Sequence, residues 1–237
     1  MSNGASLNQN GVLDDVRRAL GRSTTVPPVP LDPFIEPLYK AEPGELIARF
    51  TEEATAVRAM VYLMSDKLKF VGQIGVLVAE ICHTAGAKEV ALSDSGLISE
   101  MNLHDQLTRQ GLAVFAPEAA SLGHEGLVAR LANCGLGLTA ADYAIAETGT
   151  IVLSSDERNA LLVSLLPPVH IALVRSSQIA ATLGEVIRCV GEERISRVET
   201  SRSVTLITGP SRTSDVELVL SIGVHGPKEL HLIIIDE

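Results

Sequence analysis

The sequence predicts an α/β fold, with helices on both faces of a mostly parallel sheet and an inserted hairpin. From Gly44 onward, apolar residues at helical spacing alternate with short, almost continuously apolar runs, which is the rhythm of successive βαβ units. The chain has 237 residues, of which 46% are hydrophobic and 20% charged, so it is long and apolar enough to bury a large core. Both observations favour a packed globular domain over a disordered chain.

Residues 1–43 are predicted to be an appendage that consists of an N-terminal helix and a Pro-rich linker. Residues 11–20 place Val12 and Val16 on one helical face, and Gly21 ends the pattern. Six prolines between positions 27 and 43 then favour an extended chain. The α/β domain is therefore expected to occupy residues 44–237.

The first half of this domain alternates between the two periodicities. The segment 66–85 places Val71, Ile74 and Val78 on one helical face, and Gly86 ends it. Short apolar runs between such segments indicate strands. The predicted helices cover residues 44–58, 66–85 and 103–110, and the predicted strands cover 60–64, 89–92 and 112–115.

The second half contains the inserted hairpin. Two apolar runs, Tyr143–Ala146 and Ile151–Leu153, flank a polar turn that contains Gly149. This order is typical of two antiparallel strands. The other predicted elements are helices over 124–134 and 176–190 and strands over 169–174, 204–208 and 230–235.

Charge and cysteine content exclude several function classes. The 29 acidic and 19 basic side chains leave a net charge of −10, which opposes binding to nucleic acid, and the chain has no Trp for base stacking. Its three cysteines, Cys82, Cys134 and Cys189, are far apart and form no metal-ligand motif. With no apolar leader and no run long enough to span a bilayer, the chain is expected to be cytoplasmic.

Residues 135–140 have the glycine spacing of a dinucleotide-binding fingerprint. That motif requires a strand before it and a helix after it, whereas here the preceding residues are predicted to be helical and the following ones extended. We therefore interpret Gly135 and Gly137 as a tight connection between helix and strand and expect no NAD binding by this segment.

The loop that follows the strand 204–208 is a candidate anion site. Gly209, Ser211, Arg212 and Thr213 supply backbone amides, hydroxyl groups and a guanidinium, all of which suit a carboxylate or phosphate. Ser211, Thr213 or Ser214 would cap a short helix here. In the alternative interpretation, Arg212 pairs with Asp215 or Glu217 and only ties its own loop together.

Two further turns carry candidate catalytic residues. Glu147 lies in the hairpin turn, where a carboxylate serves as a base or nucleophile or is simply solvated. His225 lies between glycines ahead of the last strand, where it would titrate near neutral pH. Gly149 and Thr150 of the hairpin turn are assigned with the Arg212 loop to substrate binding. We expect Glu147, Arg212 and His225 to line one pocket, because open α/β sheets gather such turns at one edge.

Four stretches of the sequence resemble the LUD domain of lactate-utilisation proteins, specifically the single-domain lactate utilisation protein C (LutC/YkgG-like) type. They are residues 141–150 (ADYAIAETGT), 163–171 (VSLLPPVHI), 208–217 (TGPSRTSDVE) and 223–230 (GVHGPKEL). The resemblance covers roughly residues 44–236. It implies the fold that ribose-5-phosphate isomerase, glucosamine-6-phosphate deaminase and CoA transferases share, the NagB/RpiA/CoA transferase-like fold.

The resemblance also implies a function in bacterial L-lactate utilisation. Such proteins are one component of a three-part system that oxidises L-lactate to pyruvate, and the partner subunits are rich in cysteine and carry iron–sulfur clusters. This chain would bind no cluster or other cofactor itself, and the resemblance leaves its own catalytic role open. Two alternatives stand beside it: a stand-alone enzyme that acts on a CoA ester or sugar phosphate, with Glu147 as base or nucleophile, and a non-catalytic interaction module.

Overall fold

The structure is a computed structural model that describes residues 18–19, 43–65, 70–117, 122–155, 160–196, 203–214, 220–222 and 226–236. The chain divides into two units, Met1–Glu36 and Pro37–Glu237. Arg18 and Ala19, the described residues of the first unit, are helical. The rest of the predicted helix 11–20 and the Pro-rich linker before Pro43 lie outside the described residues. The fold below is that of the second unit.

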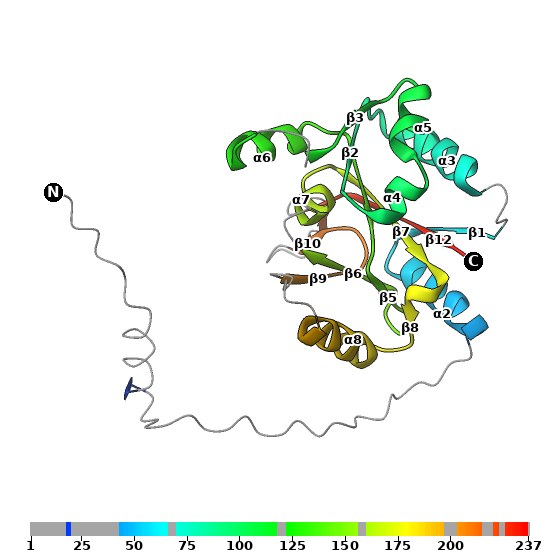
Figure 1. Ribbon diagram of the computed structural model, residues 1–237, viewed down its shortest axis with the longest axis vertical. Coiled ribbons are helices and arrows are strands. Elements are labelled where there is room, and N and C mark those ends of the chain that lie inside the picture. The colour runs from blue at the N-terminus through cyan, green and yellow to red at the C-terminus, as the bar shows by residue number, and fades with distance from the viewer. Residues whose placement is uncertain are drawn as a thin grey trace. The chain divides into compact units, whose positions relative to one another are not determined.

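Six parallel strands form the main sheet, as the alternating pattern predicted (Figure 1). The sheet has the order β1-β12-β7-β4-β2-β3. The apolar runs of its four inner strands are almost completely buried because the sheet is covered on both faces, whereas the two edge strands are partly exposed. The strands are β1 (Met60–Met64), β2 (Glu89–Leu92), β3 (Ala113–Phe115), β4 (Leu136–Ala140), β7 (Val169–Arg175) and β12 (Glu229–Ile235).

Successive residues of each strand point to opposite faces and thereby belong to different cores. On β12, Ile233 and Ile235 join the core under α3 (Phe70–Ala85), α4 (Gly96–Glu100) and α5 (Leu103–Arg109). Leu232 and Ile234 join the core that contains Phe50 of α2 (Pro43–Ala56). Two further helices, α6 (His124–Ala132) and α7 (Ala160–Leu165), share a smaller core with Ala91 of β2.

A second, smaller sheet contains the predicted hairpin. Its order is β8-β5-β6-β9, and β5 (Tyr143–Ile145) pairs antiparallel with β6 (Thr150–Ser155). The outer strands are β8 (Ile179–Ala180) and β9 (Ser203–Ile207), and α8 (Leu183–Ser196) packs on one face through Val186. The structure thus confirms both the mostly parallel sheet and the inserted hairpin. None of the described helices is long and apolar enough to cross a membrane.

Gly135 lies in the predicted tight connection between α6 and a strand, but Gly137 does not, because residues 136–140 form the central strand β4. The two glycines allow close packing: a Cβ at Gly137 would lie 2.0 Å from the carbonyl oxygen of Val163 in α7, and one at Gly135 would lie 2.5 Å from the Cβ of Ala87. A strand follows helix α6 here, so the order that a dinucleotide site needs is absent from this segment.

The predicted helix 176–190 is also wrong over residues 176–182, nearly half of its length. Residues Ser176–Gln178 form a 3₁₀ turn, Ile179–Ala180 form β8, and α8 begins only at Leu183. The Gln178 side chain causes this break: its amide nitrogen donates to the carbonyl oxygen of Ala141 at 3.0 Å, and its Oε1 accepts from the backbone nitrogen of Arg175 at 2.7 Å. These contacts hold the segment as an extra strand on the small sheet.

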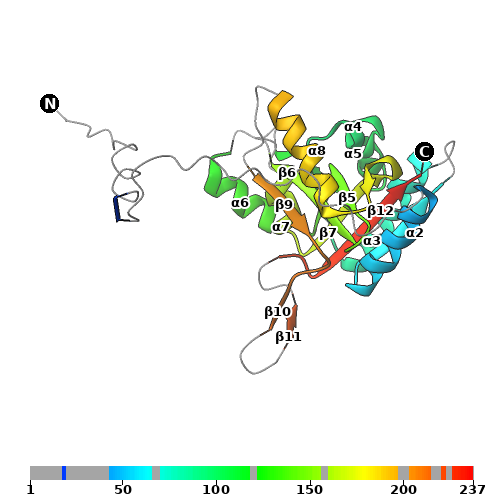
Figure 2. The same cartoon turned by 90° about the horizontal axis from the view of Figure 1, so that it is seen from below.

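The segment after Gly209 forms a strand instead of the expected short helix. Arg212–Ser214 is β10, and it pairs antiparallel with β11 (Leu220–Ile222). Figure 2 shows these two strands extending away from both sheets. Ser211, Thr213 and Ser214 therefore cap no helix at this position.

Candidate functional site

The hairpin turn and the Arg212 loop meet at the end of α2. A Cβ at Gly149 (φ +62°) would lie 2.2 Å from the backbone nitrogen of Ala54, and one at Gly209 (φ +75°) would lie 2.5 Å from the carbonyl oxygen of Val57. Both positions require a left-handed backbone and a missing side chain, which only glycine supplies without strain. We call the residues Glu147–Thr150, Thr208–Arg212 and Gly226–Pro227 the turn cluster.

Three threonine hydroxyl groups join the two turns directly. The Oγ1 atoms of Thr148 and Thr150 lie 2.7 Å apart, and those of Thr150 and Thr208 also lie 2.7 Å apart. Thr150 is 3% exposed, whereas Thr148 and Thr208 are at the surface. Since a hydroxyl both donates and accepts, this row of hydroxyls can reorient to bind either kind of polar group at its exposed ends.

The third segment of the predicted site reaches the same place. The backbone nitrogen of Ser211 donates to the carbonyl oxygen of Pro227 at 2.9 Å, and a Cβ at Gly226 would lie 3.2 Å from that of Ser211. His225 itself, and the side chain of Thr213, lie outside what the structure describes. The structure therefore brings the three predicted segments together, while the position of the His225 imidazole stays a prediction.

Glu147 holds the start of α8. Its Oε1 accepts from the backbone nitrogen of Leu183 at 2.7 Å, and its own backbone nitrogen donates to the carbonyl oxygen of Ala181 at 3.1 Å. A carboxylate is stabilised at a helix N-terminus by the free N–H groups and the helix dipole. One oxygen of this candidate catalytic residue is thus engaged in a structural contact.

Replacing Glu147 separates its structural role from a chemical one. We expect Glu147→Ala to lower the free energy of unfolding by about 1 kcal/mol, because the helix loses an acceptor at its first turn. Glu147→Gln keeps an oxygen at that position and should lose much less, as urea titrations of both variants will show. If Glu147→Gln is fully stable yet abolishes turnover, the carboxylate has a chemical role; unchanged turnover leaves it a helix cap.

Arg212 also contacts the end of α2, where its Nη2 donates to the carbonyl oxygen of Val57. The guanidinium carries five N–H donors, and this is the one hydrogen bond it makes to the residues that the structure describes. The side chain is exposed. It is therefore fixed at one edge and presents further donors to solvent, as a carboxylate-binding arginine must.

The turn cluster lies near the amino ends of the parallel strands. Val57 precedes β1, and the backbone nitrogen of Lys228, just before β12, donates to the carbonyl oxygen of Pro168, just before β7, at 2.8 Å. Ligands of open α/β sheets usually bind at the carboxyl ends. That rule does not apply to these turns, because they connect strands of the small sheet and the β10–β11 pair.

Two buried histidines escaped the sequence analysis. The Nε2 of His170 lies 2.9 Å from the Oγ1 of Thr139, and its Nδ1 has no hydrogen-bond partner within the described part of the chain. On β12, the Nδ1 of His231 lies 3.2 Å from the hydroxyl oxygen of Tyr62. Burial lowers the pKa of His231, against the opposing effect of Glu229. In the sequence, each is a histidine within an apolar run, and this pattern could have identified both.

His170 makes the stability of the fold depend on pH. Burial, with a contribution from His231, lowers its pKa from 6.5 to about 3, so the native state keeps the ring neutral while the unfolded chain protonates it below pH 6.5. Because only the unfolded chain binds this proton, the free energy of unfolding decreases as the pH falls from 6.5 towards 3. Between pH 7 and pH 5, we expect wild type to lose about 2 kcal/mol more than His170→Gln. Urea titrations at both pH values measure this, and equal losses would contradict it.

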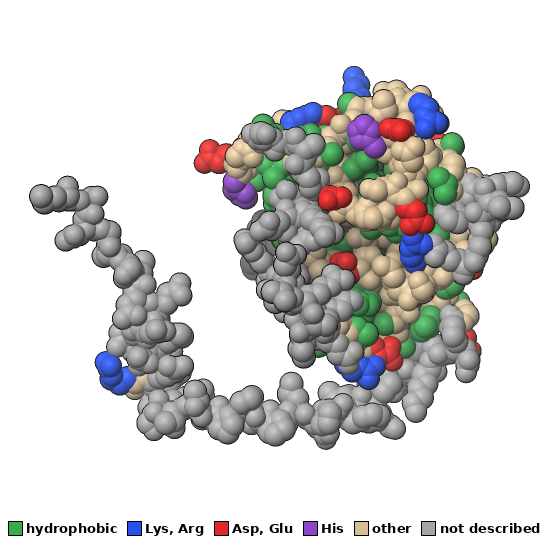
Figure 3. Space-filling view, in the orientation of Figure 1, with side chains coloured by type: hydrophobic (Ala, Val, Ile, Leu, Met, Phe, Trp, Pro, Cys, Tyr) green, Lys and Arg blue, Asp and Glu red, His purple; other side chains and the backbone are tan. Residues whose placement is uncertain are grey.

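Two of the three cysteines, Cys82 and Cys134, are buried among apolar residues, whereas Cys189 is partly exposed. Cys82 and Cys134 are buried, and burial raises the pKa of each thiol to about 11, so both are protonated at neutral pH. Within the described ranges, no group of three or more His, Cys, Asp or Glu side chains is placed to hold a metal ion. On the face drawn in Figure 3, the described Lys and Arg side chains lie singly rather than in a continuous patch.

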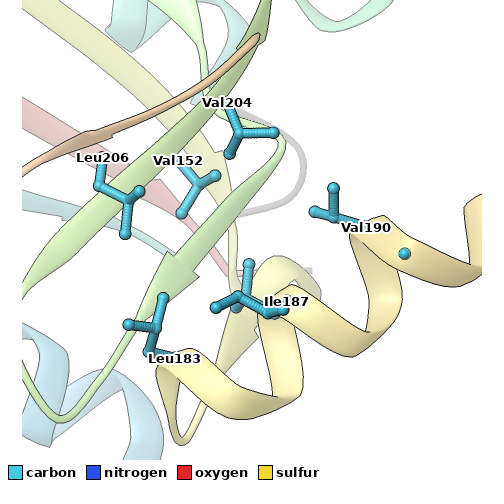
Figure 4. Close-up of a pocket in the computed structure, with 8 residues that line it drawn as sticks. Val152, Leu183, Ile187, Val190, Val204 and Leu206 are labelled. Atoms are coloured by element: carbon cyan, nitrogen blue, oxygen red, sulfur yellow. The ribbon is translucent and has the colours of Figure 1, made fainter. Parts of the chain in front are cut away.

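An apolar groove lies between α8 and the small sheet. Its volume is about 350 Å³, and Figure 4 shows Leu183, Ile187 and Val190 of α8 facing strands β6 and β9. Apart from Gly191, every residue that lines the groove is Val, Leu or Ile. Such a surface offers no hydrogen bonds to a small anion, so the candidate site stays with the turn cluster.

The fold and the turn cluster define an α/β protein in which a small mixed sheet packs beside a six-stranded parallel sheet. The model of the LUD domain family matches residues 47–235, and the chain belongs to this family.

Relatives in the family align along nearly the whole chain. "Lactate utilization protein C" of Shouchella clausii (strain KSM-K16) is 28% identical over an alignment of 239 positions that covers 97% of this chain and 98% of that protein. The protein of the same name from Bacillus licheniformis is 25% identical and is covered completely. "Uncharacterized protein YkgG" of Escherichia coli (strain K12) is 26% identical, with 97% and 99% covered.

A solved structure supports the fold independently. The crystal structure of a DUF162 family protein from Deinococcus radiodurans superimposes with a TM-score of 0.54 at 22% identity, covering 83% of this chain and 99% of that chain. At this identity the likeness concerns the fold alone.

Proposed function

We propose that this protein takes part in bacterial L-lactate utilisation as the component without an iron–sulfur cluster. The observation that carries the proposal is that relatives named for lactate utilisation align over 97–100% of the chain. The match includes the segments that form the turn cluster. The proposed place of action is the cytoplasm, together with cysteine-rich iron–sulfur subunits that would accept the electrons of lactate oxidation.

In this proposal the turn cluster binds the small anionic substrate. The guanidinium of Arg212 would receive the carboxylate of lactate through two parallel hydrogen bonds. A neighbour suits the role: the hydroxyl of Thr208, which is exposed and bonded to that of Thr150, can meet the 2-hydroxyl group. His225 is proposed to exchange a proton with that hydroxyl group.

Oxidation of lactate to pyruvate releases two electrons and two protons. Since the thiols of Cys82 and Cys134 are buried and protonated, the proposal assigns the electrons to the partner subunits and leaves binding and positioning to this chain.

Reconstitution tests the proposal. The purified chain alone should not reduce a dye with L-lactate, whereas the chain together with the proposed iron–sulfur subunits should, and the subunits should co-purify. Omitting this chain should abolish the activity. Equal activity of the partners without this chain would contradict the proposal, and turnover of a CoA ester or sugar phosphate by the isolated chain would support the stand-alone enzyme instead.

A further inference from the structure

The outer edge of β1 is open for pairing with a further strand. β1 is at one end of the strand order of the main sheet, so β12 pairs with one side of it, and no strand that the structure describes pairs with the other. All its residues are apolar or aromatic, and Leu63 and Met60 keep 52% and 38% of their surfaces exposed. The free backbone N–H and C=O groups of such an edge are a template for strand addition.

The opposite edge of the same sheet has the protection that β1 lacks. β3 is only three residues long, and the guanidinium of Arg130 lies 4.8 Å from the centre of the Phe115 ring while it is paired with Glu89. A short strand and a charged side chain are common means of preventing edge-to-edge pairing. β1 contains no charged residue, Pro or Gly. One edge of the sheet is therefore protected, and the other is suited to pairing.

The hydroxyl group of Tyr62, the one polar side-chain group of β1, already has a partner within the chain. Its oxygen lies 3.2 Å from the Nδ1 of His231 on β12, and the two rings stack with their centres 5.9 Å apart. Strand addition at the outer edge leaves this hydrogen bond in place. It therefore buries no unpaired polar side chain of β1, which would be costly.

A second copy of β1 matches this edge. If two copies run antiparallel with Tyr62 opposite Tyr62, then Met60 lies opposite Met64 and Val61 opposite Leu63. Every cross-strand pair is then apolar or aromatic, and no like charges face each other within the strands. A twofold axis between the two Tyr62 residues closes the assembly as a dimer.

The charges beside the two ends of β1 favour the same arrangement. Arg58, two residues before the strand, is exposed and has no ion pair with any residue that the structure describes. Asp236 lies beside the other end, where its backbone nitrogen donates to the carbonyl oxygen of Met64 at 2.9 Å. Glu229, at the amino end of β12, contacts His231 at 3.4 Å. Antiparallel pairing brings the amino end of one strand to the carboxyl end of the other, and so brings Arg58 of each copy to the side of Asp236 of the other copy.

We propose that this protein forms a symmetric dimer in which the β1 strands of two copies pair antiparallel and join the two main sheets into one. Backbone hydrogen bonds and the apolar cross-strand pairs hold the copies together, and the charges of Arg58 and Asp236 favour the antiparallel direction. The interface uses no residue of the turn cluster. The dimer does not depend on the proposed binding of lactate.

Size-exclusion chromatography with light scattering, over a series of concentrations of the full-length protein, tests the proposal. Wild type should have twice the mass of one chain. Leu63→Lys should be a monomer with an unchanged circular dichroism spectrum, because a charged side chain on an edge strand opposes pairing. Leu206→Lys is the matched control: Leu206 lies on β9, an edge strand of the small sheet, with 48% of its surface exposed, and this variant should remain a dimer.

Reversal of the charges tests the direction of pairing. Arg58→Glu and Asp236→Lys should each raise the dissociation constant of the dimer roughly tenfold, because each variant brings like charges together at both ends of the paired strands. The double variant should recover most of the affinity, since the same contacts form with their signs exchanged. Damage to the fold would not be rescued in this way.

Four results would overturn the proposal. They are a monomeric wild type at every concentration, a dimer that persists in Leu63→Lys, a dimer that is lost equally in Leu206→Lys, and a double charge reversal that is no better than the single variants. If wild type is a monomer and Leu63→Lys instead abolishes binding to the proposed iron–sulfur subunits, the edge pairs with another protein, and the proposal of a second copy is wrong.

Discussion

Gly149→Ala should destabilise the protein by about 2–5 kcal/mol and loosen the turn cluster. A left-handed backbone costs a residue with a Cβ about 1–2 kcal/mol, and an added methyl group in a packed site costs a further 1–3 kcal/mol. Both penalties apply here, because Gly149 has φ +62° and its Cβ would lie 2.2 Å from the backbone nitrogen of Ala54. Urea denaturation of the variant measures the loss.

Gly86 provides the matched control. It has almost the same backbone angle, φ +67°, but a Cβ there would meet nothing within 4 Å. Gly86→Ala should therefore show only the backbone penalty of about 1–2 kcal/mol. If the two variants lose the same stability, the close contact between the hairpin turn and α2 does not exist in solution.

Arg212→Ala should weaken the binding of L-lactate roughly 10- to 100-fold. The variant removes a charge-assisted, two-point contact with the carboxylate, which is worth about 1.5–3 kcal/mol. Arg212→Lys should restore only part of the affinity, because an ammonium group keeps the charge and loses the planar fork. Calorimetry with L-lactate, on the complex with its partners, gives these affinities.

The competing explanation is that Arg212 only ties β10 to the end of α2 through the carbonyl oxygen of Val57. In that case Arg212→Ala lowers the melting temperature while the affinity for L-lactate stays the same. Arg49, a half-exposed arginine on α2 that pairs with Glu52 and Glu53, is the control for loss of one positive charge. Arg49→Ala should leave the affinity unchanged.

The parallel sheet could be predicted because its strands are buried on both faces. Val169–Arg175 and Glu229–Ile235 are almost continuously apolar, and that signal is independent of tertiary context. Strand β4 was missed because Gly137 within it and Gly135 just before it suggest a turn. These glycines allow close packing against Val163 and Ala87, and those contacts exist only in the folded protein. The contacts of Gln178 that break the predicted helix 176–190 are likewise tertiary.

The turns of the candidate site could be predicted from the sequence, but their arrangement around the end of α2 could not. Glycine-containing turns identified the Glu147, Arg212 and His225 segments, yet α2 joins the first two by packing against both Gly149 and Gly209, which no local pattern reveals.

Growth on L-lactate tests the central claim most directly. The gene is deleted in a host that has no other lactate dehydrogenase, and growth is compared on L-lactate and on pyruvate. The account predicts that the deletion abolishes growth on L-lactate alone, that wild type restores it, and that Arg212→Ala, expressed at the same level, restores it poorly while Arg49→Ala restores it fully. Undiminished growth of the deletion strain on L-lactate would contradict the account.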